Sequence, residues 1–270
     1  MSFSISGKTA IVTGAANGIG LAIARQFAEQ GANVMFADVD EDRLAKEIGD
    51  SDTSETSNIR SFAGDLRQKL AQANLLSATI DAFDRVDILV NANRQIQTTD
   101  ALSAEDNSLS DLLTQNLVTS YRLSQVIARR MLSQAKHDEE HEGAIGSIIN
   151  ISSIAAHRAA PDLLAYAVSA AALDQLTRSH ALALAPHRIR VNAVAFGSVM
   201  SASLQNELRE DPNARDIIAE KTPLGRIASS GELADAVQFL ASEASAFMTG
   251  QIVTVDGGRS LMDAVESSAH

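Results

Sequence analysis

The chain has 270 residues, 45% of them hydrophobic, and a formal net charge of −12. This length suits one large α/β domain, the negative charge argues against a duplex-DNA partner, and the lack of cysteine excludes disulfides and thiolate metal sites. No apolar run is long enough to span a bilayer, and the first ten residues lack the apolar core of a signal peptide, so we expect a soluble cytoplasmic protein.

Near the start, residues 9–20 (TAIVTGAANGIG) predict a buried strand over 8–13, a glycine turn, and a helix over about 18–30. Glycine permits positive φ and close backbone approach, and the helix N-terminus presents free N–H groups to an anion. In a βαβ unit that anion is usually a dinucleotide pyrophosphate. The alternative is a tight turn in which glycine only avoids strain.

The next predicted strand, residues 33–38, ends at Asp38. A carboxylate at this position can accept hydrogen bonds from both ribose hydroxyls of adenosine, and it would repel a 2′-phosphate. No basic residue directly follows it that could hold such a phosphate. The sequence therefore favours NAD over NADP, with a simple turn residue as the alternative for Asp38.

The rest of the chain alternates helices and strands. Helices are predicted over about 41–48, 67–83, 108–135, 165–185 and 231–241, and strands over 59–63, 86–91, 146–153, 188–195 and 251–255. Residues 197–223 are irregular, with two short helical pieces, and 264–270 form a loose tail. This alternation predicts a single α/β domain over 1–270, a doubly wound parallel sheet of about seven strands with helices on both faces. Leu109, Leu112 and Leu123 mark the apolar side of the 108–135 helix.

Two polar features allow more than one interpretation. Asp65 and the N–H of Leu66 follow a strand and could lie near an adenine ring, or Asp65 could be a helix N-cap. His137 and His141 have the spacing of a helical zinc pair, but Asp138 stands where a zinc protease has glutamate and no third ligand is indicated. We therefore interpret residues 136–142 as a solvated charged loop and expect no metal site.

Six segments in order resemble the short-chain dehydrogenase/reductase family over nearly the whole chain. They are TGAANGIG at 13–20, DILVNAN at 87–93, NISS at 150–153, YAVSA at 166–170, RIRVNAVAFG at 188–197 and TVDGG at 254–258. The resemblance implies a Rossmann-type fold, a nicotinamide cofactor, and hydride transfer between that cofactor and a small carbonyl or alcohol substrate. It also implies a homotetramer, or a homodimer, assembled through the two long helices.

The resemblance assigns three catalytic residues. Ser153, at the family's usual separation from Tyr166, would orient the substrate oxygen, Tyr166 would transfer a proton to or from it, and Asn116 would hold a proton-relay water. Local alternatives are a serine hydroxyl satisfied by backbone, a tyrosine packed at the core edge, and an asparagine at a helix kink. The implied cofactor-binding residues are Gly14, Ala16, Asn17, Gly18, Ile19, Gly20, Asp38, Asp65, Leu66, Asn91, Ala92, Tyr166, Gly197 and Val199.

Three residues depart from the family's motifs. Ala170 replaces the lysine of YxxxK, which in the family holds the nicotinamide ribose and lowers the pKa of the tyrosine. Arg94 replaces a glycine after the fourth strand, where it could crowd the cofactor, lend positive charge to the site, or lie on the surface. Phe196 replaces a proline. The missing lysine bears most directly on the reaction rate, because losing a tuned acid–base group typically costs ~10²–10⁴-fold in rate.

The sequence thus supports two functions. The first is an NAD-dependent oxidoreductase that is impaired or atypical because the lysine is absent. The second is a catalytically inactive protein on the same fold that keeps dinucleotide binding or a role in subunit interaction. Met200, Leu204 and Met248 could line an apolar substrate pocket or serve ordinary packing.

Overall fold

A seven-stranded parallel sheet forms the centre of the molecule, in the order β3-β2-β1-β4-β5-β6-β7. The computed structural model describes residues 3–49, 57–136, 143–201, 204–205, 208–209, 211 and 213–263. The strands are β1 Thr9–Thr13, β2 Asn33–Asp38, β3 Ile59–Ala63, β4 Ile88–Asn91, β5 Gly146–Ser153, β6 Ile189–Phe196 and β7 Ile252–Val255. The predicted fold class is confirmed.

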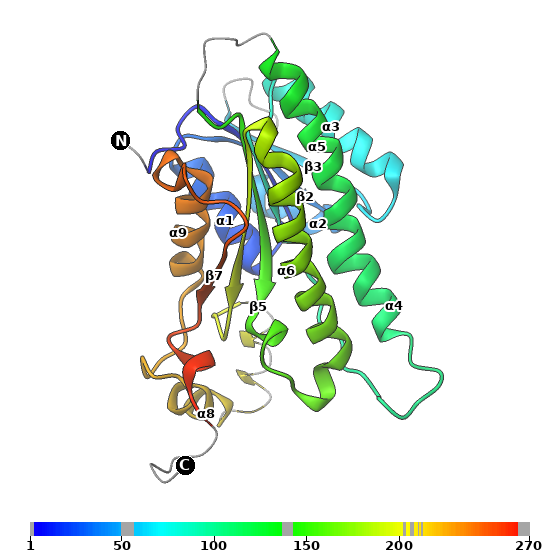
Figure 1. Ribbon diagram of the computed structural model, residues 1–270, viewed down its shortest axis with the longest axis vertical. Coiled ribbons are helices and arrows are strands. Elements are labelled where there is room, and N and C mark those ends of the chain that lie inside the picture. The colour runs from blue at the N-terminus through cyan, green and yellow to red at the C-terminus, as the bar shows by residue number, and fades with distance from the viewer. Residues whose placement is uncertain are drawn as a thin grey trace.

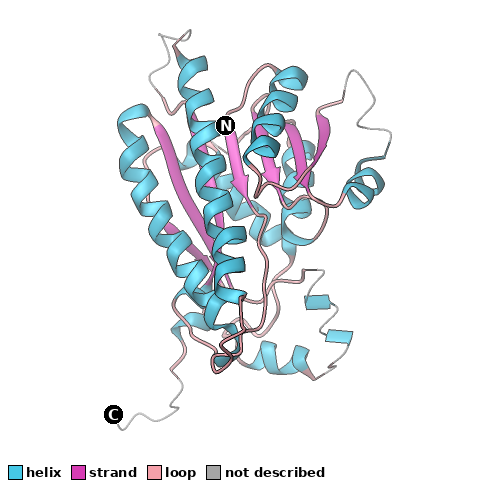
Figure 2. Cartoon of the chain, turned by 90° about the vertical axis from the view of Figure 1, so that its right-hand side faces the viewer, coloured by secondary structure: helices cyan, strands magenta, loops and turns pink. Residues whose placement is uncertain are grey.

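Helices cover both faces of this sheet (Figures 1 and 2). One layer contains α1 Gly18–Glu29, α2 Glu41–Ile48 and α9 Ser230–Ala241. The other contains α3 Lys69–Phe83, α5 Thr119–Ala135 and α6 Leu164–Leu184. Helix α4, Ser108–Leu112, precedes α5, and α8, Ala214–Glu220, lies beyond the carboxyl ends of the strands (Figure 1). Among the described residues, no helix is long and apolar enough to cross a membrane.

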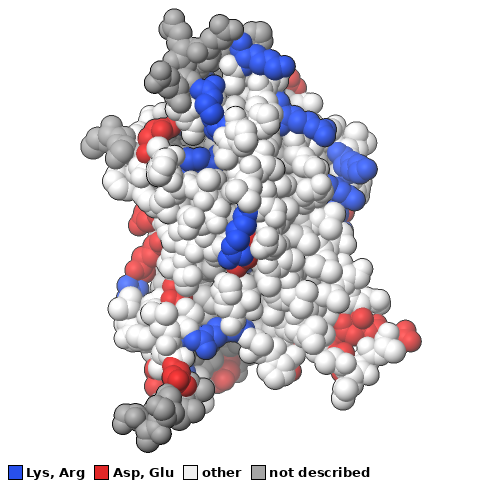
Figure 3. Space-filling view, in the orientation of Figure 1, with Lys and Arg blue, Asp and Glu red and all other residues white. Residues whose placement is uncertain are grey.

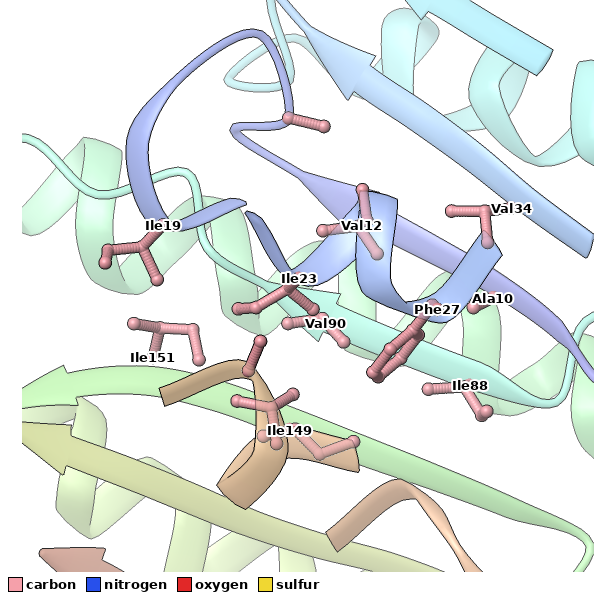
Figure 4. Close-up of a cluster of buried hydrophobic side chains, with 14 of the residues drawn as sticks. Ala10, Val12, Ile19, Ile23, Phe27, Val34, Ile88, Val90, Ile149 and Ile151 are labelled. Atoms are coloured by element: carbon pink, nitrogen blue, oxygen red, sulfur yellow. The ribbon is translucent and has the colours of Figure 1, made fainter. Parts of the chain in front are cut away.

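The core beneath the glycine turn fixes α1 on the sheet (Figure 4). Ile23 and Phe27 of α1 are fully buried and lie in one cluster with Val12 of β1 and Val90 of β4. Burying a side chain of this size contributes about 1.5–3 kcal/mol relative to leaving it exposed. The N-terminus of α1 is therefore held firmly at the carboxyl ends of β1 and β4, where the strand order reverses and open α/β sheets bind ligands.

The helix predicted over 108–135 is interrupted. A π-helical segment, η2 Leu113–Val118, separates α4 from α5. It places an extra residue in the turn, so the side chains before it lose their helical phase with those after it. As a result Leu109 is 41% exposed, contrary to its predicted place on the apolar side, whereas Leu112 and Leu123 are buried. Asn116, the candidate catalytic asparagine, lies in this segment.

The other predicted elements differ from the structure at their ends. β4 and β7 begin later than expected, β6 runs one residue further to Phe196, and α3 begins at Lys69 rather than near residue 67. In the segment 197–223, residues 204–205 and 208–209 are helical, and α8 forms a further helix. The tail at 264–270, residues 50–56 between α2 and β3, and His137 and His141 lie outside the described residues.

Candidate functional site

A cleft of about 420 Å³ opens at the carboxyl ends of β1, β2 and β4. The predicted cofactor-binding residues that line it are Gly14, Asn17, Gly18, Ile19, Gly20, Asp38, Asp65, Leu66 and Ala92. Ala16 is buried beneath it and contributes a backbone N–H, which donates to Asp38 Oδ2 at 3.0 Å. We call this the dinucleotide cleft, after the ligand that the sequence predicts for it.

The glycines of the turn have separate structural reasons. A Cβ on Gly14, whose φ is +66°, would lie 2.6 Å from the carbonyl oxygen of Ala92, and one on Gly20 would lie 2.1 Å from the carbonyl oxygen of Gly14. Gly18 has φ +56°, and the nearest atom to its Cβ position is 4.0 Å away. Asn17 offers no side-chain cap, and the first turn of α1 carries no acidic residue. The backbone N–H groups in the first turn of α1 therefore face the cleft without a side-chain partner and can bind an anion.

Gly18→Ala is expected to weaken NADH binding by about tenfold or more while the protein stays folded, because its methyl group would enter the cleft beside the N–H groups of α1. The left-handed φ itself costs about 1–2 kcal/mol of stability. Gly49→Ala is the matched control, because Gly49 also has φ +56° with no atom within 4 Å and does not line the cleft. Fluorescence titration measures the NADH affinity, and thermal unfolding measures the stability. Equal NADH affinity in the two variants would contradict the anion site.

Asp38 is fixed at the end of β2 as both a turn residue and a wall of the cleft. Its Oδ1 accepts hydrogen bonds from the N–H groups of Val39 (2.7 Å) and Asp40 (3.1 Å), in addition to the bond from Ala16. Val39 is exposed and also lines the cleft, and among the described residues no lysine or arginine forms a salt bridge with Asp38. The carboxylate is thereby oriented by backbone groups rather than by a neighbouring base.

Asp65 is not a helix N-cap, because α3 begins only at Lys69 and Gln68 holds the cap position. Its carboxylate instead pairs with Arg67, at 2.9 Å to both Nε and Nη2, and this hydrogen bond lowers the pKa of Asp65. Arg67 also lines the dinucleotide cleft. Arg67 is not among the residues predicted for the site, although its place two residues after Asp65 is a sequence signal for it.

Arg94 lines both the dinucleotide cleft and a second cleft, which Ser153 and Tyr166 also line. Its Nη1 donates a hydrogen bond to the hydroxyl oxygen of Tyr166. The guanidinium carbon lies 4.5 Å from the ring centroid of Phe196 and 5.5 Å from that of Tyr166, within range of cation–π attraction to both. Arg94 is thus half-buried against two aromatic rings, and the interpretation of it as a surface arginine is wrong.

The loop that carries Arg94 is held from two sides. Asn116 accepts a hydrogen bond from the N–H of Gln95 (2.8 Å) and donates to the carbonyl of Gln95 (3.0 Å) and to Ser169 Oγ (3.1 Å). Thr13 Oγ1 accepts from the N–H groups of Ala92 and Asn93. The side-chain amide of Asn116 is therefore hydrogen-bonded to the backbone of Gln95, the residue next to Arg94.

Ala170 lies next to Arg94 and Tyr166 around a buried cavity of only about 10 Å³, room for about one water. Asn116 and Asn91 also line this cavity. Asn91 faces away from the dinucleotide cleft, because its amide donates to Ser124 Oγ and Asn150 Oδ1. No long side chain fits at position 170 while Arg94 holds its present place.

Ser152 and Ser153 point to opposite sides of β5. Ser152 donates to the buried carboxylate of Asp174 at 2.5 Å, and burial raises the pKa of that carboxyl group. Ser153 Oγ accepts from the N–H of Ala155 at 3.1 Å and lines the second cleft, of about 470 Å³, with Tyr166, Gly197 and Val199. Ser153 and Tyr166 thus share one cleft. Among the described residues, no group of three or more His, Asp or Glu side chains is placed to hold a metal.

Comparison with known proteins places this site in context. A family model described as enoyl-(acyl carrier protein) reductase matches residues 14–260. The chain is 34% identical to an uncharacterized oxidoreductase of Mycobacterium tuberculosis (95% of this chain, 93% of the relative) and 33% identical to the L-xylulose reductase of Mesocricetus auratus (96% and 98%). The structure of a Caenorhabditis elegans short-chain dehydrogenase/reductase of unknown function, determined with cofactor, superposes with a TM-score of 0.82 at 29% identity, covering 97% of this chain and 98% of that one.

Proposed function

The chain belongs to the short-chain dehydrogenase/reductase family, and from that premise we propose that it is an NAD-dependent oxidoreductase in which Arg94 acts in place of the family's lysine. Members of the family use a nicotinamide dinucleotide cofactor. The substrate is a small carbonyl or alcohol compound. The observation that carries the proposal is the hydrogen bond from Arg94 to the hydroxyl of Tyr166.

The three departures from the family's motifs meet around one side chain, Tyr166. Ala170 leaves the space beside the tyrosine without a long side chain, Arg94 supplies a cation there, and the ring of Phe196 supports the guanidinium. Loss of function under no selection would leave unrelated substitutions, whereas Arg94 contacts Phe196 and lines the same small cavity as Ala170 and Tyr166. This arrangement favours an adapted site over a decayed one.

The residues that line the dinucleotide cleft fit the parts of a nicotinamide dinucleotide. The free N–H groups at the start of α1 would hold the pyrophosphate, Asp38 the adenosine ribose, and Asp65 with Leu66 the adenine. The carboxylate of Asp38 favours NAD, since a 2′-phosphate would meet its charge. When bound, the nicotinamide supplies the hydride acceptor or donor.

The protein's own residues would manage the proton. Tyr166 would give its hydroxyl proton to the substrate oxygen during reduction and take it back during oxidation, and Ser153 Oγ would donate a hydrogen bond that orients that oxygen. Arg94 would stabilise negative charge on the tyrosine oxygen, because its guanidinium stays protonated. Asn116 would act as a positioning residue, holding the loop at Gln95 so that Arg94 reaches Tyr166.

The alternative is a catalytically inactive protein that still binds a dinucleotide. It is favoured by one observation, the stacking of Arg94 on Phe196 at the edge of the dinucleotide cleft, which narrows the space for a nicotinamide ring. We also propose a homotetramer or homodimer through α5 and α6, since Tyr121, Val168 and Leu182 of these helices are exposed apolar side chains.

NADH titration followed by cofactor fluorescence, with turnover of a panel of small ketones and aldehydes, tests the proposal. We expect saturable binding and NADH oxidation by the unmodified chain. Binding without turnover, even in Ala170→Lys combined with Arg94→Gly, would favour the inactive alternative. Absence of binding at millimolar NADH would overturn both cofactor-based functions.

A further inference from the structure

The second cleft is strongly basic, in a protein that is acidic as a whole. Three arginines line it, Arg94, Arg158 and Arg259, and none of the described residues that line it is acidic. The whole chain carries a net charge of −12. In Figure 3 one basic patch lies in the lower part of the molecule, near the place of the short helix η7 Arg259–Leu261 in Figure 1, with acidic side chains beside it. A cluster of one sign in a cleft concentrates ligands of the opposite charge.

Two of these arginines are held by neutral partners. Arg158 Nη2 donates to the carbonyl oxygens of Ser260 and Met262, and Arg259 Nη1 donates to Ser198 Oγ at 2.5 Å. Asp256, whose carboxylate feels the charge of Arg259, accepts hydrogen bonds from the N–H groups of Gly258 and Ser260. Burial raises its pKa, but these hydrogen bonds and the charge of Arg259 outweigh that effect and lower it. Each guanidinium has five N–H donors, so both keep donors for a ligand.

The two arginines and the reacting groups line one cleft. Arg158 donates to the carbonyl oxygen of Ser260, the residue that follows Arg259, so the two arginines belong to one cluster. Ser153, Tyr166 and Arg94 are the reacting groups of the same cleft. Ile96, Leu163 and Leu204 add apolar lining. A ligand that fits this arrangement has a polar carbonyl, a short apolar spacer and an anionic group.

We propose that the substrate is a carbonyl or hydroxy compound bearing a carboxylate, which Arg158 and Arg259 bind while its reacting oxygen meets Ser153 and Tyr166. This inference rests on the proposed function, because it names the substrate class of the same site. Arginine suits the task, since its planar fork matches the two oxygens of a carboxylate. Arg94 is already engaged with Tyr166 and does not bind the carboxylate.

The test is calorimetric binding of 4-oxopentanoate, 5-oxohexanoate and 6-oxoheptanoate, each compared with its uncharged methyl ester, with and without NADH. We expect at least one acid to bind about tenfold or more tightly than its ester, as for a hydrogen-bonded charge. Arg158→Gln and Arg259→Gln should each reduce that acid-to-ester ratio about tenfold, and Arg158→Lys should restore part of it.

The control is Arg25→Gln, which removes the same charge from an arginine of α1 that pairs with Glu47 and does not line the cleft. It should leave the ratio unchanged. Equal binding of every acid and its ester by the unmodified chain would overturn the inference, as would tighter binding of inorganic phosphate than of all three acids. Because binding is read without turnover, a failure of the proposed oxidoreductase activity would be seen separately, as absent NADH oxidation.

Discussion

Arg94→Ala is expected to lower kcat by ~10²–10³-fold with little change in the Kd of NADH. The variant removes the only cation that the described structure places against the Tyr166 hydroxyl, so the tyrosine oxygen would lose the charge that stabilises it in the reaction. Arg94→Lys should recover part of the rate, because an ammonium keeps the charge but lacks the planar stacking on Phe196. Steady-state kinetics and fluorescence titration measure the two quantities independently.

Arg67→Ala is the matched control for that experiment. Arg67 lines the dinucleotide cleft as Arg94 does, but it pairs with Asp65 and does not contact Tyr166. Its loss should act on cofactor affinity rather than on kcat. If both variants reduce kcat equally, or if Arg94→Ala leaves kcat unchanged, then Arg94 has no special role at the tyrosine.

Asp38→Asn is expected to reduce the preference for NAD over NADP by about 10–100-fold in kcat/KM. The substitution removes a negative charge beside the adenosine ribose, and juxtaposed like charges cost several kcal/mol when they are poorly solvated. Asparagine keeps an oxygen that can accept from Ala16 or from Val39, so the turn is preserved. The preference is measured as the ratio of kcat/KM values for the two reduced cofactors.

Asp40→Asn serves as the control for Asp38, since it lies two residues further on, caps α2 through the N–H of Arg43 and does not line the cleft. Its cofactor preference should equal that of the unmodified chain. An Asp38→Asn protein that still rejects NADP as strongly as before would show that the carboxylate is only a turn residue.

The strands and the glycine turn could be predicted because local sequence determines them. Short apolar runs bounded by polar or glycine residues specify buried parallel strands, as in β2 and β5, which have the predicted bounds. The edge strand β3 also has the predicted bounds, although it is only partly buried. Gly20 is required by its contact with Gly14 within the same turn, whereas the atoms that exclude a side chain at Gly14 belong to Ala92 and Asn93, after β4. The strand, the glycine pattern and the helix follow one another directly in the chain, so a single sequence contains the signal for the turn.

The π-helical turn at Asn116 and the position of Arg94 could not be predicted in this way. The 3.6-residue period of residues 108–135 continues across η2, and what interrupts the helix is packing against Gln95 and Ser169, which are distant in sequence. The sequence singled out Arg94 as unusual, but its contact with Tyr166 joins residues 72 apart. Only the fold brings those residues together.

The most direct test of the account is the activity of Arg94→Gly, Ala170→Lys and the double variant, measured as kcat beside the unmodified chain. Ala170→Lys should lose activity, because the cavity of about 10 Å³ cannot hold a lysine next to Arg94. Arg94→Gly should lose activity because it removes the cation that contacts the Tyr166 hydroxyl. The double variant has room for the lysine and returns a cation to Tyr166, so it should be more active than either single variant, a strong non-additivity. If the two losses simply multiply, or if Ala170→Lys alone increases kcat while Arg94 remains, then Arg94 does not replace the lysine.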